Sequence, residues 1–295
     1  MLFQEAFKNI SNYLKFNWYS DRNTCVTNIS GDSVSKSDMV CNDFMVNDIK
    51  NSDLNIIGYI SEESENIVFI KEPSATEPNY LVAFDPLDGS SNVKYNINCG
   101  TIYCIYEFDY ENYKLKNILK AGYCLFGSSV VLVETQNTEL QMYVLDDKNC
   151  FNFIQNINFD NQNNNIYSIN QSNDYDKQIN FLISCYRSKK YNQRWIGTMV
   201  ADCHRVLLSN GIFIYTNSAK NPNGKIRLIY EALPFAYMFS LIGGYGLDGS
   251  FNNILDKISK IDLRNKIHTR TEIILCSKKE YDHINILLDC FEDKN

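Results

Sequence analysis

The feature that most constrains this chain is an apolar run that ends in two aspartates on a tight turn. Residues 80–84 (YLVAF) form the run, and residues 85–89 (DPLDG) follow directly. A short run of apolar and aromatic residues is typical of a buried strand, whereas a proline and a glycine favour a turn. The sequence therefore predicts that Asp85 and Asp88 lie close together at the end of a buried strand.

This pair of carboxylates indicates a cation site. Asp85 and Asp88 would repel each other unless a cation lies between them, and oxygen ligands suit Mg²⁺ or Mn²⁺. The next residues, Gly89, Ser90 and Ser91, offer backbone N–H groups and hydroxyls of the kind that bind phosphate. The alternative is an ordinary turn in which Asp and Ser side chains bond to nearby backbone. An Asp-x-x-Asp-Gly pattern alone favours that alternative, but the full string after a buried strand favours a metal and phosphate site.

Other acidic residues also lie near the ends of apolar runs. Glu62 and Glu63 come directly after one run, Glu231 ends another, and Asp32 and Asp38 lie further upstream. Taken singly, each is typical of a solvated loop. Together they match the way in which a site is assembled at the strand ends of a sheet.

Strand-like and helical patterns alternate along the chain. Apolar and β-branched runs predict strands at 66–70, 80–84, 99–108, 128–134, 166–170, 211–215 and 225–230. Helical spacing predicts an amphipathic N-terminal helix and further helices at about 198–208 and 233–241. This alternation favours a layered α/β or α+β architecture. The Asn-rich segment 154–165 is expected to connect two domains, residues 1–160 and 161–295.

Charge and composition limit the partners. The net charge of −7 argues against a sequence-independent nucleic-acid partner, which needs a basic surface. No apolar stretch approaches the length of about 18 residues that a membrane helix needs, so we expect no membrane partner. None of the 10 cysteines forms a C-x-x-C pair, which favours reduced thiols in the cytoplasm. The plastid is the alternative location if a transit peptide has been removed.

Several motifs resemble those of class I fructose-1,6-bisphosphatases, in order from about residue 30 to the end. They are SEE (61–63), FDPLDGSSN (84–92), YCLFGSSVVLV (123–133), RWIGTMVADCHR (194–205), GIFIY (211–215) and KIRLIYEALPFAY (225–237). The resemblance implies a layered α-β-α-β-α sugar-phosphatase fold, with two mixed sheets packed with helices. It also implies Mg²⁺-dependent hydrolysis of the 1-phosphate of fructose 1,6-bisphosphate, to fructose 6-phosphate and phosphate, as in gluconeogenesis.

The resemblance further assigns roles position by position. The implied metal ligands are Glu62, Asp85, Asp88, Glu231 and the backbone carbonyl of Leu87, for two or three Mg²⁺ ions that Mn²⁺ can replace. Asp38, Glu63 and Asp32 are implied to activate the attacking water. The 1-phosphate is assigned to Gly89, Ser90 and Ser91, and the sugar with its distal phosphate to Asn170, Tyr215 and Lys225. Arg194 is implied to reach in from a neighbouring subunit, which implies a homodimer or a homotetramer.

The sequence also departs from the family pattern. The stretch before Asp32 is short compared with members that AMP inhibits, so the resemblance predicts weak or no AMP inhibition. Asn173 and Trp195 stand where many members carry tyrosines at the distal phosphate. Residues 247–257 resemble sedoheptulose-1,7-bisphosphatases at least as well, which leaves a seven-carbon sugar as the alternative substrate. Two further alternatives are an inactive scaffold relative, against which the four acidic ligands stand, and an inositol-phosphate phosphatase, which carries Trp-Asp in place of the Tyr-Glu pair that ends at Glu231.

Overall fold

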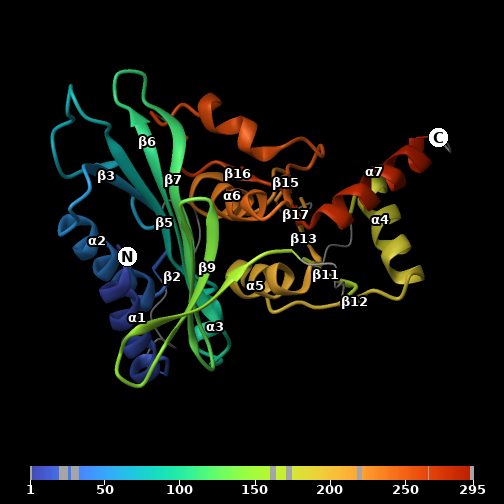
Figure 1. Cartoon of the computed structure of the whole chain (residues 1–295), viewed down its shortest axis with the longest axis horizontal. Coiled ribbons are helices and arrows are strands. Elements are labelled where there is room, and N and C mark those ends of the chain that lie inside the picture. Colours follow the sequence, from blue (N-terminus) through green and yellow to red (C-terminus); the bar gives the residue numbers. More distant parts are fainter. Residues whose placement is uncertain are drawn as a thin grey trace.

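The computed structural model places two β-sheets side by side, with helices between and outside them (Figure 1). It describes residues 2–19, 26–27, 33–159, 164–170, 175–217, 221–264 and 266–292. Two N-terminal helices cover the outer face of the first sheet, and two others cover the outer face of the second (Figure 1). The layer order is therefore α-β-α-β-α, which confirms the fold class expected from the sequence.

The outer layer beside the first sheet consists of α1 (Gln4–Asn17) and α2 (Lys36–Lys50). The apolar residues of α1 recur at helical spacing, and its buried face carries Ala6, Phe7, Ile10 and Leu14. A capping box starts α2, because the Ser35 hydroxyl accepts from the Asp38 N–H while the Asp38 carboxylate accepts from the Ser35 N–H. This cap fixes the point at which α2 begins.

The first sheet has eight strands in the order β10-β9-β8-β7-β6-β5-β3-β4. Its members are β3 (Ile56–Ser61), β4 (Val68–Phe69), β5 (Tyr80–Asp88), β6 (Cys99–Asp109), β7 (Lys114–Phe126), β8 (Val130–Gln136), β9 (Glu139–Leu145) and β10 (Phe151–Ile157). Neighbours pair antiparallel except β3 and β5, which are parallel. Parallel pairing brings the C-terminal ends of β3 and β5, and the acids that follow them, to one edge of the sheet. A separate pair, β1 (Val26–Thr27) and β2 (Ser33–Val34), is antiparallel.

The second sheet has five strands in the order β12-β11-β13-β17-β15. They are β11 (Ile166–Ile169), β12 (Asn192–Gln193), β13 (Ile212–Tyr215), β15 (Tyr245–Leu247) and β17 (Ile273–Cys276). Between the sheets lie α5 (Met199–Ser209) and α6 (Leu233–Leu241), and outside lie α4 (Lys177–Ser188) and α7 (Lys278–Glu292) (Figure 1). The largest hydrophobic cluster joins both sheets through α5 and α6. These two helices therefore hold the halves of the molecule together.

The strand predicted at 225–230 is largely wrong. Only β14 (Ile226–Arg227) is extended, paired with β16 (Arg270–Thr271), and the chain then enters the short π-helix η2 (Leu228–Ala232). The Leu233 N–H donates to the Leu228 carbonyl, the wide i→i+5 spacing of a π turn. A propensity argument misses this turn because Leu, Ile and Tyr all suit a strand.

The structure also revises the segment 154–165 and adds shorter elements. Its first residues belong to β10, an edge strand whose side chains are mostly exposed, which explains its polar composition. The shorter elements are α3 (Ser90–Val93) and the 3-10 helix η3 (Ile254–Lys260). Among the described residues no helix is both long and apolar enough to cross a membrane. All nine cysteines in the described part of the chain are free thiols.

A charged group lies buried in the first sheet. The Glu134 side chain on β8 is 1% exposed, and it accepts hydrogen bonds from the Tyr103 hydroxyl (2.6 Å) and the Gln136 amide (2.6 Å). Its counter-ion is Lys120 on β7, with Nζ 2.9 Å from the carboxylate. A buried carboxylate that loses its cation keeps its desolvation cost without compensation.

We therefore expect Lys120→Met to lower the free energy of unfolding by about 2 kcal/mol in urea denaturation. The double variant Lys120→Met/Glu134→Gln should recover much of that loss, since the remaining charge is gone. Lys116→Met on the same strand is the matched control, because Lys116 makes only an exposed 3.7 Å pair with Asp109. The control should change stability by less than about 0.5 kcal/mol. Equal losses in the two single variants would contradict this assignment.

Candidate metal and phosphate site

One cavity of about 290 Å³ gathers the acidic residues expected from the sequence. It lies where the ends of β3 and β5 meet the start of α5, the end of β13 and the π-helix η2. Its acidic lining residues are Asp38, Glu62, Glu63, Asp85, Asp88 and Glu231. Acids separated by up to 193 residues in sequence, 231 minus 38, therefore face a single space.

Three of these acids form the tightest group. Asp85, Asp88 and Glu231 each offer a carboxylate oxygen, and these oxygens all lie within 4.8 Å of one another. Asp85 is 2% exposed and Glu231 is 8% exposed, so little water reaches them. Among the described residues, no lysine or arginine forms an ion pair with any of the three.

Backbone N–H groups orient the three carboxylates. Asp85 Oδ1 accepts from the Leu87 N–H at 2.9 Å, within the DPLDG turn, where the register of β5 against β6 shifts. Asp88 Oδ2 accepts from the Val200 N–H at 2.7 Å, in the first turn of α5. Glu231 accepts from the Arg227 N–H across the start of η2. Each carboxylate thus has a fixed direction before any ligand arrives.

Their protonation shows how unfavourable three buried charges are. Burial, followed by the charge of Glu62, raises the pKa of Asp85 well above its usual range. Burial also raises the pKa of Asp88 to about 6, against which the Val200 N–H acts. Burial and then the charge of Glu62 raise the pKa of Glu231 to about 8. A divalent cation bound among the three carboxylates would offset these shifts, because its positive charge stabilises their ionised forms.

This donor set fits Mg²⁺ or Mn²⁺ rather than zinc. The ligand-bearing atoms are carboxylate oxygens, with Glu62 close enough for its charge to act on both Asp85 and Glu231. Burial, and then the charges of nearby site acids, raise the pKa values of two core cysteines, Cys99 and Cys203, and neither of them lines the cavity. Hard oxygen ligands without sulfur or imidazole are typical of Mg²⁺ and Mn²⁺ sites.

The turn after Asp88 requires its glycine. Gly89 has φ +77°, a left-handed conformation that residues with side chains rarely adopt. A Cβ at Gly89 would lie 2.6 Å from the Cβ and Cγ2 atoms of Thr198 on the facing segment. Ser90 and Ser91 follow as the first residues of α3, and both line the cavity. The turn therefore presents backbone and hydroxyl groups directly beside the three carboxylates.

Most of the other predicted residues also line this cavity. Glu62 and Glu63 lie just after β3, where the Glu62 N–H donates to the Phe84 carbonyl and the Glu63 N–H to the Ser61 hydroxyl. Asp38 is 4% exposed and also caps α2. Leu87, Tyr215 and Lys225 complete the predicted residues in the lining.

Two predicted residues of the described part, Asn170 and Arg194, do not join them. Asn170 does not line the cavity, because its side chain bonds to the backbone N–H and carbonyl of Thr216. Arg194 is exposed and also outside the lining, although the next residue, Trp195, is part of it. Asp32 lies outside the described residues, as does Asn173.

Among the lining residues that sequence reasoning missed, two carry polar side chains, Arg227 and Thr198. Arg227 is 4% exposed and lines the cavity beside Lys225 and Glu231. Strand alternation in Lys225-Ile226-Arg227 puts the two basic side chains on one face, and this signal could have revealed it. Thr198 caps α5 and faces Gly89, a contact between distant segments that no local pattern predicts.

Comparison with known proteins identifies the relatives of the chain. Residues 4–156 match the family described as "Fructose-1-6-bisphosphatase, N-terminal domain", and residues 161–289 match its C-terminal domain. A cytosolic fructose-1,6-bisphosphatase of Arabidopsis thaliana is 36% identical over 91% of this chain and 81% of its own length. Fructose-1,6-bisphosphatase 1 of Rattus norvegicus is also 36% identical, over 86% of this chain and 72% of its own.

A solved structure agrees with these relatives. The crystal structure of Leishmania major fructose-1,6-bisphosphatase in holo form matches with a TM-score of 0.81 and 26% identity. The match covers 97% of this chain and 92% of the other. Sequence and three-dimensional comparison therefore point to the same relatives across both halves of the chain.

The pKa shifts predict how the metal-stripped protein responds to pH. Folded Glu231 keeps its proton up to about pH 8, whereas the unfolded chain loses it near 4.5. The folded state therefore binds more protons between those values, and stability falls as pH rises through this window. Asp88 adds a smaller loss of stability between pH 3.8 and about pH 6. We expect the free energy of unfolding to drop by on the order of 3 kcal/mol from pH 5 to pH 8, since one pKa unit is worth about 1.4 kcal/mol.

Urea denaturation of chelator-treated protein across this pH range measures the drop. Saturating Mg²⁺ should abolish it, and Glu231→Gln should flatten it in the metal-stripped protein. A metal-stripped wild type whose stability stays level or rises between pH 5 and pH 8 would show that burial and neighbouring charges do not raise the pKa values of these carboxylates.

Proposed function

The chain belongs to the fructose-1,6-bisphosphatase family, and we propose that the cavity described above hydrolyses the 1-phosphate of fructose 1,6-bisphosphate, giving fructose 6-phosphate and phosphate. The protein is a phosphoric monoester hydrolase that acts on a sugar bisphosphate. The observation that supports this site best is the convergence of Asp85, Asp88 and Glu231 beside the turn 89–91.

The activity depends on a metal, and we assign it to Mg²⁺, two or three ions per subunit, with Mn²⁺ as a substitute. The residues that would hold it are Glu62, Asp85, Asp88, Glu231 and the carbonyl of Leu87, all in the lining of one cavity. When bound, these ions supply Lewis-acid polarisation of the phosphoryl group and of the water. The burial of the carboxylates and the closeness of their oxygens support this assignment.

The other lining residues divide the remaining work. Gly89, Ser90 and Ser91, which line the cavity, bind the 1-phosphate through N–H and hydroxyl groups. Glu63 and Asp38, with Asp32, take the proton that the attacking water loses as its oxygen bonds to phosphorus. Water and the sugar oxygen then occupy opposite sides of phosphorus, so the bond to the sugar breaks as the new one forms.

The sugar end of the substrate requires positive and polar groups. Lys225 and Tyr215 line the cavity and come from segments that are distant in sequence from the turn 89–91, and the buried Arg227 adds a second positive charge. Asn170 acts through its two bonds to Thr216, which hold the residue next to Tyr215. Asn170 therefore positions this segment and does not itself line the cavity.

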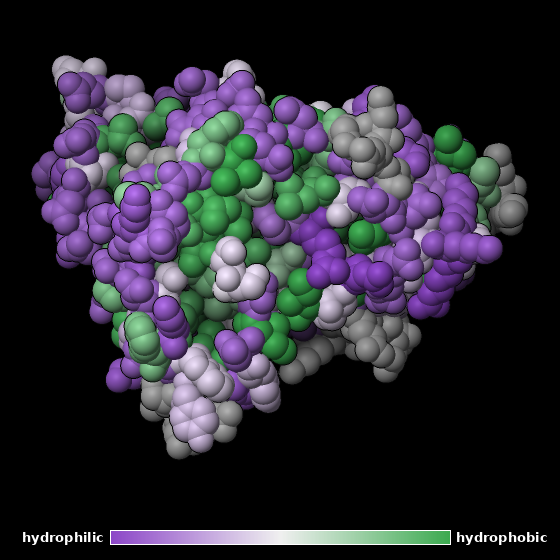
Figure 2. Space-filling model, turned by 60° about the horizontal axis from the view of Figure 1, so that its bottom comes forward, coloured by the Kyte–Doolittle hydropathy of each residue, from purple (hydrophilic) through white to green (hydrophobic). Residues whose placement is uncertain are grey.

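Arg194 completes the site from a neighbouring subunit, in a homodimer or homotetramer. Its side chain is exposed and lies outside the lining of its own cavity, which is what a residue serving another subunit requires. Hydrophobic residues gather in the middle of the face shown in Figure 2, and the edge strand β10 exposes Phe153 and Ile154 to 53% and 51%. Exposed apolar surface of this kind is typical of subunit contacts.

We propose the remaining assignments by analogy with the family. The domain boundary falls near residue 160, with metal and phosphate binding in 1–160 and sugar-phosphate binding in 161–295. The location is the cytoplasm, and the reaction belongs to carbohydrate metabolism. The cytosolic relatives from plants support that location.

Phosphate release with Mg²⁺ tests the substrate directly. We expect fructose 1,6-bisphosphate to be hydrolysed faster than sedoheptulose 1,7-bisphosphate, and inositol 1-phosphate not at all. Asp85→Asn should lose activity by at least about 100-fold, because a shared metal ligand is gone, yet keep its circular dichroism spectrum. A faster rate on sedoheptulose 1,7-bisphosphate would show that the seven-carbon sugar is the preferred substrate. An Asp85→Asn variant as active as wild type would refute the site.

Mixing a variant with weakened substrate binding and an inactive variant tests the subunit-crossing arginine. We expect Arg194→Ala to raise KM for fructose 1,6-bisphosphate by about 10-fold or more, since a charge-assisted contact to phosphate is lost. Mixed oligomers of Arg194→Ala and Asp85→Asn should regain activity at low substrate, because one site then has both its own acids and its neighbour's arginine. Arg187→Ala on the exposed face of α4 is the control and should keep the wild-type KM. No gain on mixing, with exchange of subunits shown by mass spectrometry, would exclude a crossing role.

A further inference from the structure

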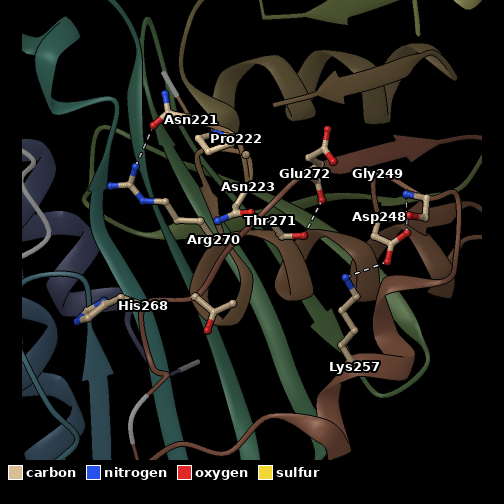
Figure 3. Close-up of a pocket in the computed structure, with 13 residues that line it drawn as sticks. Asn221, Pro222, Asn223, Asp248, Gly249, Lys257, His268, Arg270, Thr271 and Glu272 are labelled. Carbon is tan, nitrogen blue, oxygen red and sulfur yellow. Dashed lines mark hydrogen bonds and ion pairs between the residues drawn. The ribbon is translucent and has the colours of Figure 1, made fainter. Parts of the chain in front are cut away.

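We infer that His268 is a positioning residue that keeps the two acidic segments of the metal site at a fixed distance, an inference that rests on the function proposed above. His268 lies between η3 and β16, on the wall of a second cavity of about 660 Å³. Figure 3 shows its ring at one end of this cavity, pointing away from the other labelled residues. The sequence motifs did not include it, and it is not in the lining of the metal cavity.

Both ring nitrogens of His268 are used. Nε2 lies 2.8 Å from the Ser64 carbonyl oxygen, and Nδ1 lies 2.9 Å from the Tyr230 hydroxyl. A carbonyl oxygen can only accept, so Nε2 carries the hydrogen and Nδ1 accepts from the tyrosine. Burial lowers the pKa of His268, which favours this neutral form. The imidazole therefore bridges the segment that contains Ser64 and the segment that contains Tyr230.

The two segments are those that carry the acids. Ser64 closes the turn after β3, where its N–H donates to the Ser61 carbonyl, and this turn contains Glu62 and Glu63. Tyr230 belongs to the π-helix and directly precedes Glu231. The histidine is thus 204 residues from Ser64 in sequence and 38 from Tyr230, yet one ring connects both.

The backbone around His268 is itself fixed to the site. The buried Arg227 guanidinium donates to the His268 carbonyl at 3.3 Å, and the Leu228 N–H donates to the Thr269 carbonyl at 2.8 Å. The adjoining strands β14 and β16 pair through Arg227 and Arg270. Because Arg227 also donates its N–H to Glu231, the histidine and the metal ligand share one support.

This arrangement explains what the ring does. A metal ion binds well only if ligands from the two segments keep their spacing, and residues behind the ligands set that spacing. Removing the ring would leave the Ser64 carbonyl and the Tyr230 hydroxyl without these bonds, and the β3 turn and η2 could then separate. The consequence should appear in metal affinity before any effect on substrate.

Substitutions of His268 can remove one bond at a time. Gln places an amide N–H near the position of Nε2 and can keep the Ser64 bond, whereas Asn places a carbonyl near Nδ1 and can keep the Tyr230 bond. His268→Phe keeps a ring and removes both bonds. His283→Phe on α7 is the matched control, since His283 contacts Lys189 and Glu280, both outside the metal cavity.

The main measurement is Mn²⁺ binding to metal-stripped protein by electron paramagnetic resonance. We expect His268→Phe to raise the Kd for Mn²⁺ by about 10-fold. His268→Gln and His268→Asn should raise it by intermediate amounts, and the control should leave it unchanged. The Phe variant should also need about 10-fold more Mg²⁺ for half-maximal activity at an unchanged KM for the sugar. A folded His268→Phe protein that binds Mn²⁺ within about twofold of wild type would overturn the inference. If that variant does not fold, Tyr230→Phe, which deletes one hydroxyl, decides on the same criterion.

The second cavity provides an independent readout. Because His268 is part of its wall, imidazole added to His268→Ala can enter the space that the side chain leaves. We expect imidazole to restore part of the Mn²⁺ affinity in His268→Ala but not in His268→Phe, whose ring fills that space. No restoration in the Ala variant would count against a role for the ring's hydrogen bonds.

These outcomes separate the inference from the proposed function. If the wild-type protein does not hydrolyse fructose 1,6-bisphosphate but His268→Phe binds Mn²⁺ more weakly than the wild type, the function is refuted and the positioning role is supported. Wild-type protein that hydrolyses the sugar, with unaltered metal affinity in the variant, would refute only the positioning role.

Discussion

The burial of Asp85, Asp88 and Glu231 close to one another is the constraint on which the rest of the structure depends. Their oxygens lie within 4.8 Å of one another and are largely shielded from water, so the fold must supply energy to keep them there. That energy comes from the packing of α5 and α6 between two sheets, which forms the largest hydrophobic cluster of the molecule. A core of this kind tolerates an unfavourable site because its apolar burial contributes far more than one cluster of charges removes.

Both halves of the chain hold the carboxylates in place. Asp88 is on the first sheet, but the N–H that it accepts belongs to Val200 on the helix between the sheets. Gly89 lies against Thr198 on the same segment, too close for any side chain. The phosphate turn and the start of α5 therefore form one unit, although 112 residues separate Asp88 from Val200. A loss of packing between the sheets would disturb the site without touching a ligand.

Much of this could be predicted from the sequence, and the exceptions have physical reasons. The string from Asp85 to Ser91 identified the turn because a buried strand, a proline and a glycine act locally, and the ordered motifs gave the fold. The π-helix at 228–232 was missed since its residues suit a strand and only the tertiary fold selects the wider turn. Arg227 and His268 were missed because their roles lie in contacts with distant segments. Asn170 was expected to bind the sugar, but its amide is committed to Thr216.

The capping box of α2 has a consequence for the chemistry itself. Asp38 faces the cavity with the same carboxylate that accepts the Ser35 N–H at 2.7 Å. A proton taken up by that group weakens its pull on the Ser35 N–H, since a neutral acid is a poorer acceptor than its anion. The opening turn of the helix would then loosen for as long as the proton stays, and tighten again when it leaves. The first turn of α2, at Ser35, would therefore loosen and re-form once in each catalytic cycle.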